Sequence, residues 1–141
     1  MSKLNAKPQN PLWQTTKSER NSYYTYFFGQ NMIYGLLAGF LTTYLMFVEV
    51  DLIKAAAVTL VVKVWDAVND AFFGVIFDKI NFKSGKKYLP WLKIAAILTP
   101  LTTVAVFTIP ESLGENAKLI WFAVAYILWD TAYTLCDVPA F

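Results

Sequence analysis

Two carboxylates and an amide stand close together in the middle of the chain, in a stretch that is otherwise apolar. At 100° per residue, Lys63, Asp66 and Asp70 fall within an arc of roughly 60° on a helix, with Asn69 directly beside them. A carboxylate at the centre of a bilayer costs about 2.5 to 3.5 kcal/mol, so this pair needs a positively charged partner. Carboxylate and amide oxygens are ligands that hard cations favour. The spacing indicates a site for Na⁺ or a proton, and the alternative is a Lys63–Asp66 ion pair that only fixes helix packing.

A second polar face lies near the carboxyl end of the chain. It combines carboxylates with hydroxyls within an arc of roughly 100°, on Tyr126, Asp130, Tyr133, Thr134 and Asp137. Sugar hydroxyls donate to carboxylates, and the C–H face of a sugar packs against an aromatic ring. This mixture indicates a sugar site, with Tyr133, Trp129 and Phe141 as candidate rings. For Trp129, packing between helices is the alternative.

Four long apolar stretches must position these groups. The composition is 57% hydrophobic with a mean hydropathy of +0.43, and a helix needs about 20 mainly apolar residues to cross a membrane. We expect a polar amino-terminal tail over residues 1–21 and a membrane domain over 22–141. Its spans are expected at about 22–48, 52–77, 88–109 and 119–141. The sequence therefore predicts an all-α membrane protein with four transmembrane helices.

The positive charges predict the orientation of these helices. Lysine and arginine gather before the first span and around the link between the second and third, whereas the other two links offer Lys54 and Lys118. The positive-inside rule then places the amino terminus in the cytoplasm of a multi-pass cell-membrane protein. Because no basic residue follows Lys118, we expect the fourth helix to be cut short.

Composition argues against several other functions. There is no histidine and a single cysteine, Cys136, so a disulfide framework, a Cys/His zinc site and histidine base chemistry are excluded. The net charge of +2 is too small to suggest nucleic acid. Paired aspartates could act as acid and base, but no second catalytic group accompanies them, so we expect no enzyme and no cofactor other than a coupling ion.

Three sequence motifs resemble one transporter family. WDAVND (65–70) and YTLCDVPAF (133–141) resemble the glycoside, pentoside and hexuronide:cation symporters of the major facilitator superfamily, which include the melibiose carriers. A third motif resembles the cytoplasmic gating loop of the superfamily, with matches at Gly74, Asp78, Lys79, Gly85, Lys86 and Lys87, followed by Leu89, Pro90 and Trp91.

The resemblance implies the first four helices of a twelve-helix fold. It implies a cation site on Asp66, Asn69, Asp70 and Thr134, with Lys63 as a buried charge partner. It places sugar contacts on Gln30, Asn31, Tyr133, Asp137 and Phe141. Melibiose carriers have lysine and aspartate at the Gln30 and Asn31 positions and tryptophan at the Phe141 position, so a xyloside, a glucuronide and other glycosides all remain open.

These expectations describe the amino-terminal portion of an importer that moves a sugar with Na⁺ or H⁺. We expect it to be inactive alone, because alternating access needs a second half of the carrier to move against. Its expected partners are the lipid bilayer and either the missing carboxyl-terminal helices or a full-length carrier. Two alternatives come from other classes: a small self-associating membrane pore, and a non-transporting partner of a full-length carrier.

Overall fold

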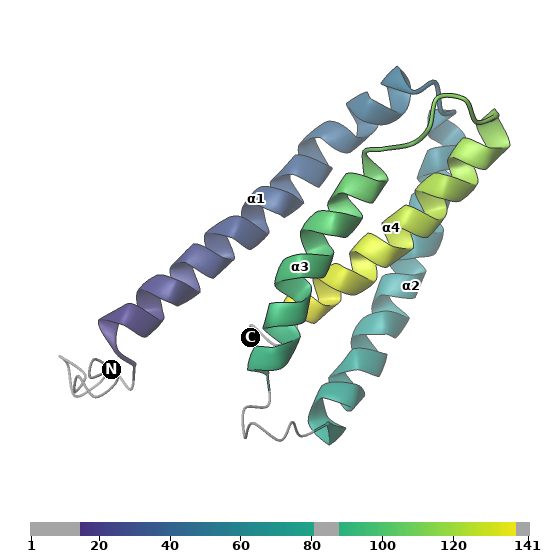
Figure 1. The fold of residues 1–141 in the computed structure, drawn as a ribbon. Helices are drawn as coiled ribbons and strands as arrows, with labels where there is room; N and C mark the ends of the chain where they lie inside the picture. Colours follow the sequence, from purple (N-terminus) through teal and green to yellow (C-terminus); the bar gives the residue numbers. More distant parts are fainter. Residues whose placement is uncertain (1–14, 81–87, 138–141) are drawn as a thin grey trace. The chain divides into compact units, whose positions relative to one another are not determined.

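The chain is α-helical throughout the part that the structure describes. The computed structural model describes residues 15–80 and 88–137, and within these ranges there are helices and connecting turns but no strand. Figure 1 shows the four helices, which are α1 (Lys17–Phe47), α2 (Leu52–Lys79), α3 (Leu89–Val106) and α4 (Glu115–Asp137). This confirms the all-α fold expected from the four apolar stretches.

The chain forms two compact units, Met1–Leu36 and Leu37–Phe141. The first unit contains the beginning of α1, which opens with a capping box. The Thr16 backbone N–H donates to Glu19 Oε2 at 2.7 Å, and the Glu19 backbone N–H donates to Thr16 Oγ1 at 3.2 Å. Two backbone N–H groups that a helix start leaves without partners are thereby satisfied, which explains why α1 begins before the apolar stretch does.

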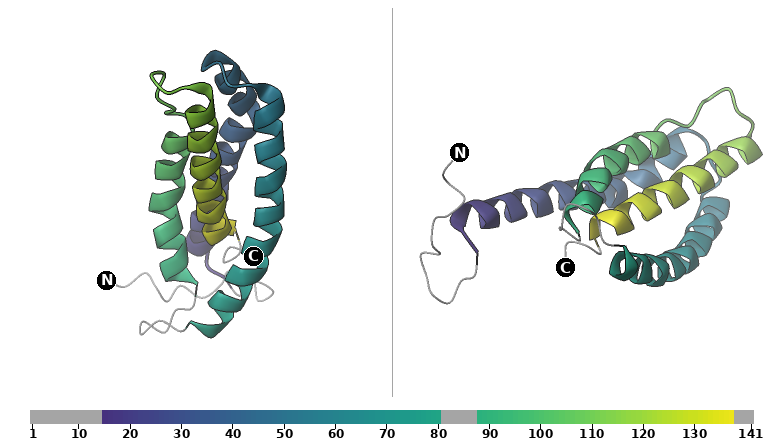
Figure 2. Two further views of the ribbon diagram at one scale, coloured as in Figure 1. Left: turned by 90° about the vertical axis from the view of Figure 1, so that its right-hand side faces the viewer. Right: turned by 60° about the horizontal axis from the view of Figure 1, so that its bottom comes forward.

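The second unit is built around α4. This helix lies between α2 and α3, as the left view of Figure 2 shows, and packs against both. Two bonds join it to α3: the Trp129 indole N–H donates to Thr103 Oγ1 at 3.0 Å, and the Thr99 hydroxyl donates to the Ala132 carbonyl at 3.3 Å. Because α4 has neighbours on two sides, it contains more buried residues than α2 or α3.

The carboxyl end of α1 is closed by a Schellman motif. The Val50 N–H bonds the Leu45 carbonyl and the Glu49 N–H bonds the Met46 carbonyl, with Glu49 in the left-handed region at φ 58°. The ammonium of Lys118 on α4, a buried residue, donates to the Val48 carbonyl at 2.8 Å. A cation thus satisfies one of the last carbonyls of α1 and ties this end of the helix to α4.

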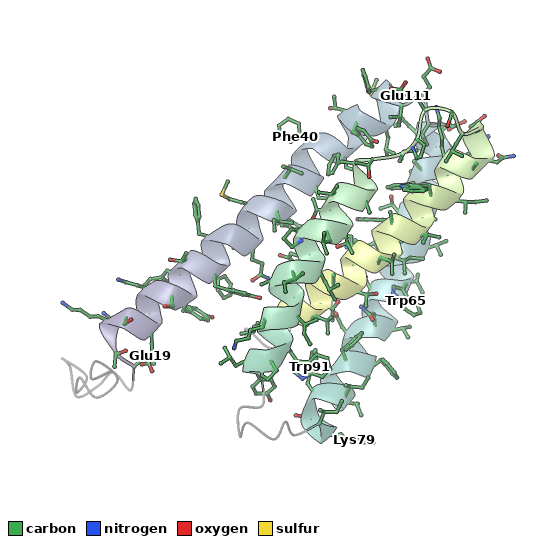
Figure 3. The ribbon with its side chains drawn as sticks, in the orientation of Figure 1. Glu19, Phe40, Trp65, Lys79, Trp91 and Glu111 are labelled. Atoms are coloured by element: carbon green, nitrogen blue, oxygen red, sulfur yellow. The ribbon has the colours of Figure 1, made fainter. Side chains whose placement is uncertain are left out.

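The links on either side of α3 also have local explanations. Pro110 disfavours helical geometry at Ile109, and α3 ends at Val106, three residues before the end of the expected third span. At the other end of α3, the Trp91 ring packs edge-on against Phe77 of α2, with 4.9 Å between ring centroids. Figure 3 shows Trp91 directed from the start of α3 toward the end of α2. The boundaries of the membrane itself remain a prediction.

Many large apolar side chains point outward. Ile53 is 83% exposed and Phe47 is 76% exposed, and α2 and α3 carry several more such residues. By length and composition alone, α3 and α4 could each cross a membrane, with mean hydropathies of 1.5 and 1.4. The charged residues of α2, and the amides Gln30 and Asn31 in α1, lower the apolar character of the other two helices. An apolar exterior of this extent is typical of a surface that contacts lipid or further helices.

Candidate cation and substrate site

The polar faces of α2 and α4 meet at a threonine hydroxyl. The Asn69 amide on α2 donates to Thr134 Oγ1 on α4 at 3.0 Å, and the Thr134 hydroxyl lies 3.0 Å from Asp70 Oδ1. Asn69 and Thr134 are buried, whereas Asp70 is exposed. The structure therefore brings together three of the four residues that the sequence predicts as cation ligands.

The Thr134 hydroxyl has one proton and two acceptors within reach. Besides Asp70 Oδ1, the carbonyl of Asp130 lies 3.1 Å away, one helical turn earlier on α4. When the proton points to that carbonyl, both the hydroxyl oxygen and the Asp70 carboxylate are available to a cation. The Asn69 side chain also has a carbonyl oxygen, which is a neutral acceptor. Oxygens of this kind are what a hard cation such as Na⁺ requires.

Asp66, the fourth predicted ligand, has a different partner. Its Oδ2 lies 3.4 Å from the Lys63 ammonium, three residues earlier on the same helix. The Asp66 side chain is 32% exposed and the Lys63 side chain is 56% exposed. Lys63 is therefore a charge partner of Asp66, but it is not the buried one that we expected. Figure 3 labels Trp65, which directly precedes Asp66 and marks this level of α2. Asp66 is thus held by an ammonium, and Asp70 by a hydroxyl.

The site differs from a multi-carboxylate metal centre. Within residues 15–80 and 88–137, no three His, Cys, Asp or Glu side chains converge as a tightly held metal ion would require. Two carboxylates with one amide and one hydroxyl instead suit a weakly held monovalent ion, which a transporter must also release.

The predicted substrate residues on α4 continue the same helix. Tyr133 and Asp137 are both partly exposed. The Tyr133 ring stacks on Trp129, with 5.1 Å between centroids and 22° between planes. Trp129 is buried and donates to Thr103 on α3. The packing alternative therefore describes Trp129 better, whereas Tyr133 keeps exposed surface.

The other predicted residues fall in three different places. Gln30 and Asn31 belong to the first unit, where the Asn31 amide donates to the Phe27 carbonyl of its own helix at 2.8 Å. Gly74, Asp78 and Lys79 lie in the last turns of α2, and Lys79 is the basic residue of the last turn. The predictions at Gly85, Lys86, Lys87 and Phe141 fall outside the described residues.

Asp130 lies on the polar face of α4, but the sequence assigns it no role. It is 4% exposed, and its Oδ2 has no hydrogen-bond donor among the described residues. The charged groups that act on it are Asp66, Lys63 and Asp70, all on α2. The helical spacing of Asp130 from Thr134 signalled the shared face, but the opposing helix was needed to show what it faces.

Residues 22–141 match the family described as MFS/sugar transport protein. The chain is 33% identical over 126 residues to an uncharacterized symporter, YnaJ, of Bacillus subtilis, covering 86% of this chain and 26% of that protein. It is 34% identical over 127 residues to the isoprimeverose transporter of Lactiplantibacillus pentosus, covering 86% of this chain and 25% of that protein. It is also 26% identical over 104 residues to the sodium-dependent lysophosphatidylcholine symporter 1-A of Danio rerio, covering 73% and 19%.

The chain spans about a quarter of the length of the first two of these relatives. The family match covers α1 from residue 22 onward and all of α2, α3 and α4, including both polar faces, and the relatives are membrane symporters. The family match therefore agrees with the motifs on α2 and α4 and with the apolar exterior. The chain belongs to the sugar transport family of the major facilitator superfamily, the melibiose-carrier-like cation symporters, and its four helices are transmembrane helices of that fold.

Proposed function

We propose that this chain forms the part of a sugar or glycoside symporter that holds the coupling cation, Na⁺ or H⁺, between α2 and α4. The observation that carries the proposal is the bridge from Asn69 through Thr134 to Asp70. It joins two helices at a point where carboxylate, amide and hydroxyl oxygens gather. A cation there would neutralise Asp70 and compete with Lys63 for Asp66.

The names of the relatives support the cation more strongly than the substrate. The isoprimeverose transporter and the lysophosphatidylcholine symporter differ widely in the substrate that each name states, and the second name specifies sodium. A sodium dependence stated for one relative, together with different substrates in the two names, suits a site in which α2 supplies the ion ligands. Tyr133 and Asp137 on α4 would contact the sugar, together with Gln30, Asn31 and Phe141.

Calorimetric titration of Na⁺ into the protein in lipid nanodiscs tests the cation site. In Asp70→Asn the side chain keeps its shape but loses its charge, and we expect Na⁺ affinity to fall at least about tenfold, or about 1.4 kcal/mol. Glu111→Gln, which removes an exposed carboxylate from the link before α4, is the matched control and should bind Na⁺ normally. Normal Na⁺ affinity in Asp70→Asn would show that the cation site is elsewhere. If Na⁺ does not bind and sugar binding depends on pH instead, the coupling ion is a proton.

Uptake into vesicles tests whether the chain works alone. In transporters of this type the substrate site lies between two halves that rock against each other, and this chain corresponds to about a quarter of its relatives. We therefore expect no sugar-dependent Na⁺ uptake by the 141-residue chain. Coupled uptake by the purified chain would refute this, and Na⁺ flux that ignores sugar would favour a self-associating pore.

A further inference from the structure

Asp130 is a buried carboxylate that the proposed cation site does not use. It lies on α4 and is 4% exposed, and no donor among the described residues reaches its Oδ2. A buried charge without a partner destabilises a protein, inside a membrane as well as in a soluble core. The Asp130 carboxyl shares a hydrogen bond with the Asp66 carboxyl, and a positive partner would stabilise its charged form.

The groups that face Asp130 come from α2. They are the Asp66 and Asp70 carboxylates and the Lys63 ammonium, and Lys63 also interacts with the Tyr126 phenol on α4. Two carboxylates thus act on Lys63, Asp66 on its own helix and Asp130 on α4. In this structure the ion pair of Lys63 is with Asp66, at 3.4 Å, and Asp130 Oδ2 has no hydrogen-bond donor.

Cation binding would change this distribution of charge. A cation on Asp66 and Asp70 repels the Lys63 ammonium and takes its acceptor. The Lys63 side chain is 56% exposed on a flexible stem of four carbons, so its ammonium is able to move to another carboxylate. The charges of Asp130 and Lys63 act on each other across the helix interface without an ion pair in this structure, and Asp130 Oδ2 has no hydrogen-bond donor among the described residues.

We propose that Asp130 is the second counter-ion of Lys63: when the cation occupies Asp66 and Asp70, Lys63 leaves Asp66 and pairs with Asp130. This proposal rests on the proposed cation site. The exchange replaces an ion pair within α2 by one that joins α2 to α4. Cation occupancy would then tighten the contact between the helix that binds the ion and the helix that carries Tyr133 and Asp137. Asp130 is a positioning residue in this scheme, because it acts on the ion through Lys63.

Na⁺ titration of four variants in nanodiscs tests the exchange: the unchanged protein, Asp130→Asn, Lys63→Ala and the double variant. Without Asp130 the ammonium stays on Asp66 and competes with Na⁺, so Asp130→Asn should lower Na⁺ affinity about tenfold. In the Lys63→Ala background there is no ammonium to relocate. The same Asp130→Asn change should then alter affinity by no more than about twofold, giving a clear non-additive result.

A simple charge effect predicts a different pattern. If Asp130 acts only by its negative charge, Asp130→Asn lowers affinity by the same factor in both backgrounds, and that result overturns the exchange. Asp130→Glu keeps a carboxylate and should retain most of the affinity. The control is Glu111→Gln, which removes an exposed carboxylate from the link before α4 and should leave Na⁺ binding unchanged.

The outcomes also separate the two proposals. If Asp70→Asn abolishes Na⁺ binding while Asp130→Asn does not change it, the cation site stands and the exchange is wrong. If Asp70→Asn binds Na⁺ normally, or if the unchanged protein neither binds Na⁺ nor binds sugar in a pH-dependent way, the cation site itself is wrong and the exchange fails with it.

Discussion

At the scale of single residues, the site is organised by which group holds each carboxylate. Asp70 accepts from a neutral hydroxyl, Asp66 pairs with an ammonium, and Asp130 has an oxygen without a donor. A cation can bind Asp70 while the hydroxyl stays in place, because the hydroxyl oxygen is itself a ligand. A cation can bind Asp66 only if the ammonium moves away from that carboxylate. Chemically identical side chains on two helices can therefore have separate tasks.

Asp137 allows the substrate assignment to be separated from the cation assignment. It is partly exposed at the end of α4, one turn beyond Tyr133. In Asp137→Asn we expect sugar affinity to fall by about tenfold or more, because a charged acceptor of sugar hydroxyls is lost. Na⁺ affinity measured without sugar should stay normal, the reverse of Asp70→Asn. Calorimetric titration of each ligand measures both, and loss of Na⁺ binding with normal sugar binding would contradict the assignment.

At the scale of elements, the end of α1 is held by contacts from outside that helix. The Tyr44 hydroxyl accepts from the Ile109 N–H at 2.8 Å, and Lys118 donates to the Val48 carbonyl. The Lys54 ammonium at the start of α2 pairs with Glu115 at the start of α4, at 2.6 Å. These bonds join the α1–α2 turn to α4 and to the segment before it. They lie at the opposite end of α2 from Phe77 and Trp91.

Glu49 makes this turn testable. A residue with a side chain pays about 1 kcal/mol or more to adopt the left-handed geometry, which glycine adopts freely. We therefore expect Glu49→Gly to stabilise the protein by up to about 1 kcal/mol and to raise its thermal midpoint in nanodiscs. Glu111→Gly, at a position without positive φ, should not stabilise it. An equal rise in both variants would mean that backbone strain is not the cause.

The capping box at the start of α1 gives a pH dependence. Hydrogen bonds from the backbone N–H and hydroxyl of Thr16 lower the pKa of Glu19 below its ordinary value of 4.5. Since the folded-state pKa is the lower one, this stabilisation is fully present above pH 4.5 and is lost as the pH falls through the folded-state value. Hydrogen exchange in the first turn of α1, corrected for intrinsic rates, should therefore accelerate on acidification.

Glu19→Gln is the matched control for that measurement. Its amide oxygen can still accept from Thr16, but it has no proton to take up. Protection of the first turn of α1 should then be independent of pH between about 6 and about 3. The same acid response in both variants would show that another group is responsible.

At the scale of the whole molecule, charge and exposure together describe a membrane protein. Apolar side chains on α2 and α3 point outward, and polar groups gather where α2 meets α4. This is the opposite of a water-soluble helical bundle, in which the apolar residues would be inside. The family match agrees with this pattern, since the exterior of a membrane transporter is apolar.

The orientation of the helices is a prediction at this scale. Basic residues gather before α1 and around the α2–α3 link, so both should lie in the cytoplasm. A reporter fused after Gly85 should behave as cytoplasmic. A reporter fused after Gly114 should behave as external. The opposite pattern at both positions would reverse the topology, and the same side at both would contradict a crossing by α3.

Hydropathy and helical spacing were enough to predict the four helices and the polar faces of α2 and α4, and the resemblance of three motifs pointed to the family. The reason is that helical geometry converts spacing directly into angle, and charges are costly enough in a membrane to be conspicuous. Helix ends were less predictable: α1 starts at Lys17 because of a capping box, and α3 ends before Pro110. Local hydrogen bonds outside the apolar stretches decide such boundaries.

Only the tertiary structure decided which polar groups meet. The sequence puts Asp66 and Asp70 on one face of α2 and the resemblance adds Thr134 to their site, but only the structure shows that Thr134 reaches Asp70 while the Lys63 ammonium lies beside Asp66. It also left Asp130 without an assigned role. These contacts depend on how α2 and α4 cross, which is set by side-chain packing between residues more than 60 positions apart in the chain. No periodicity within one helix contains that information.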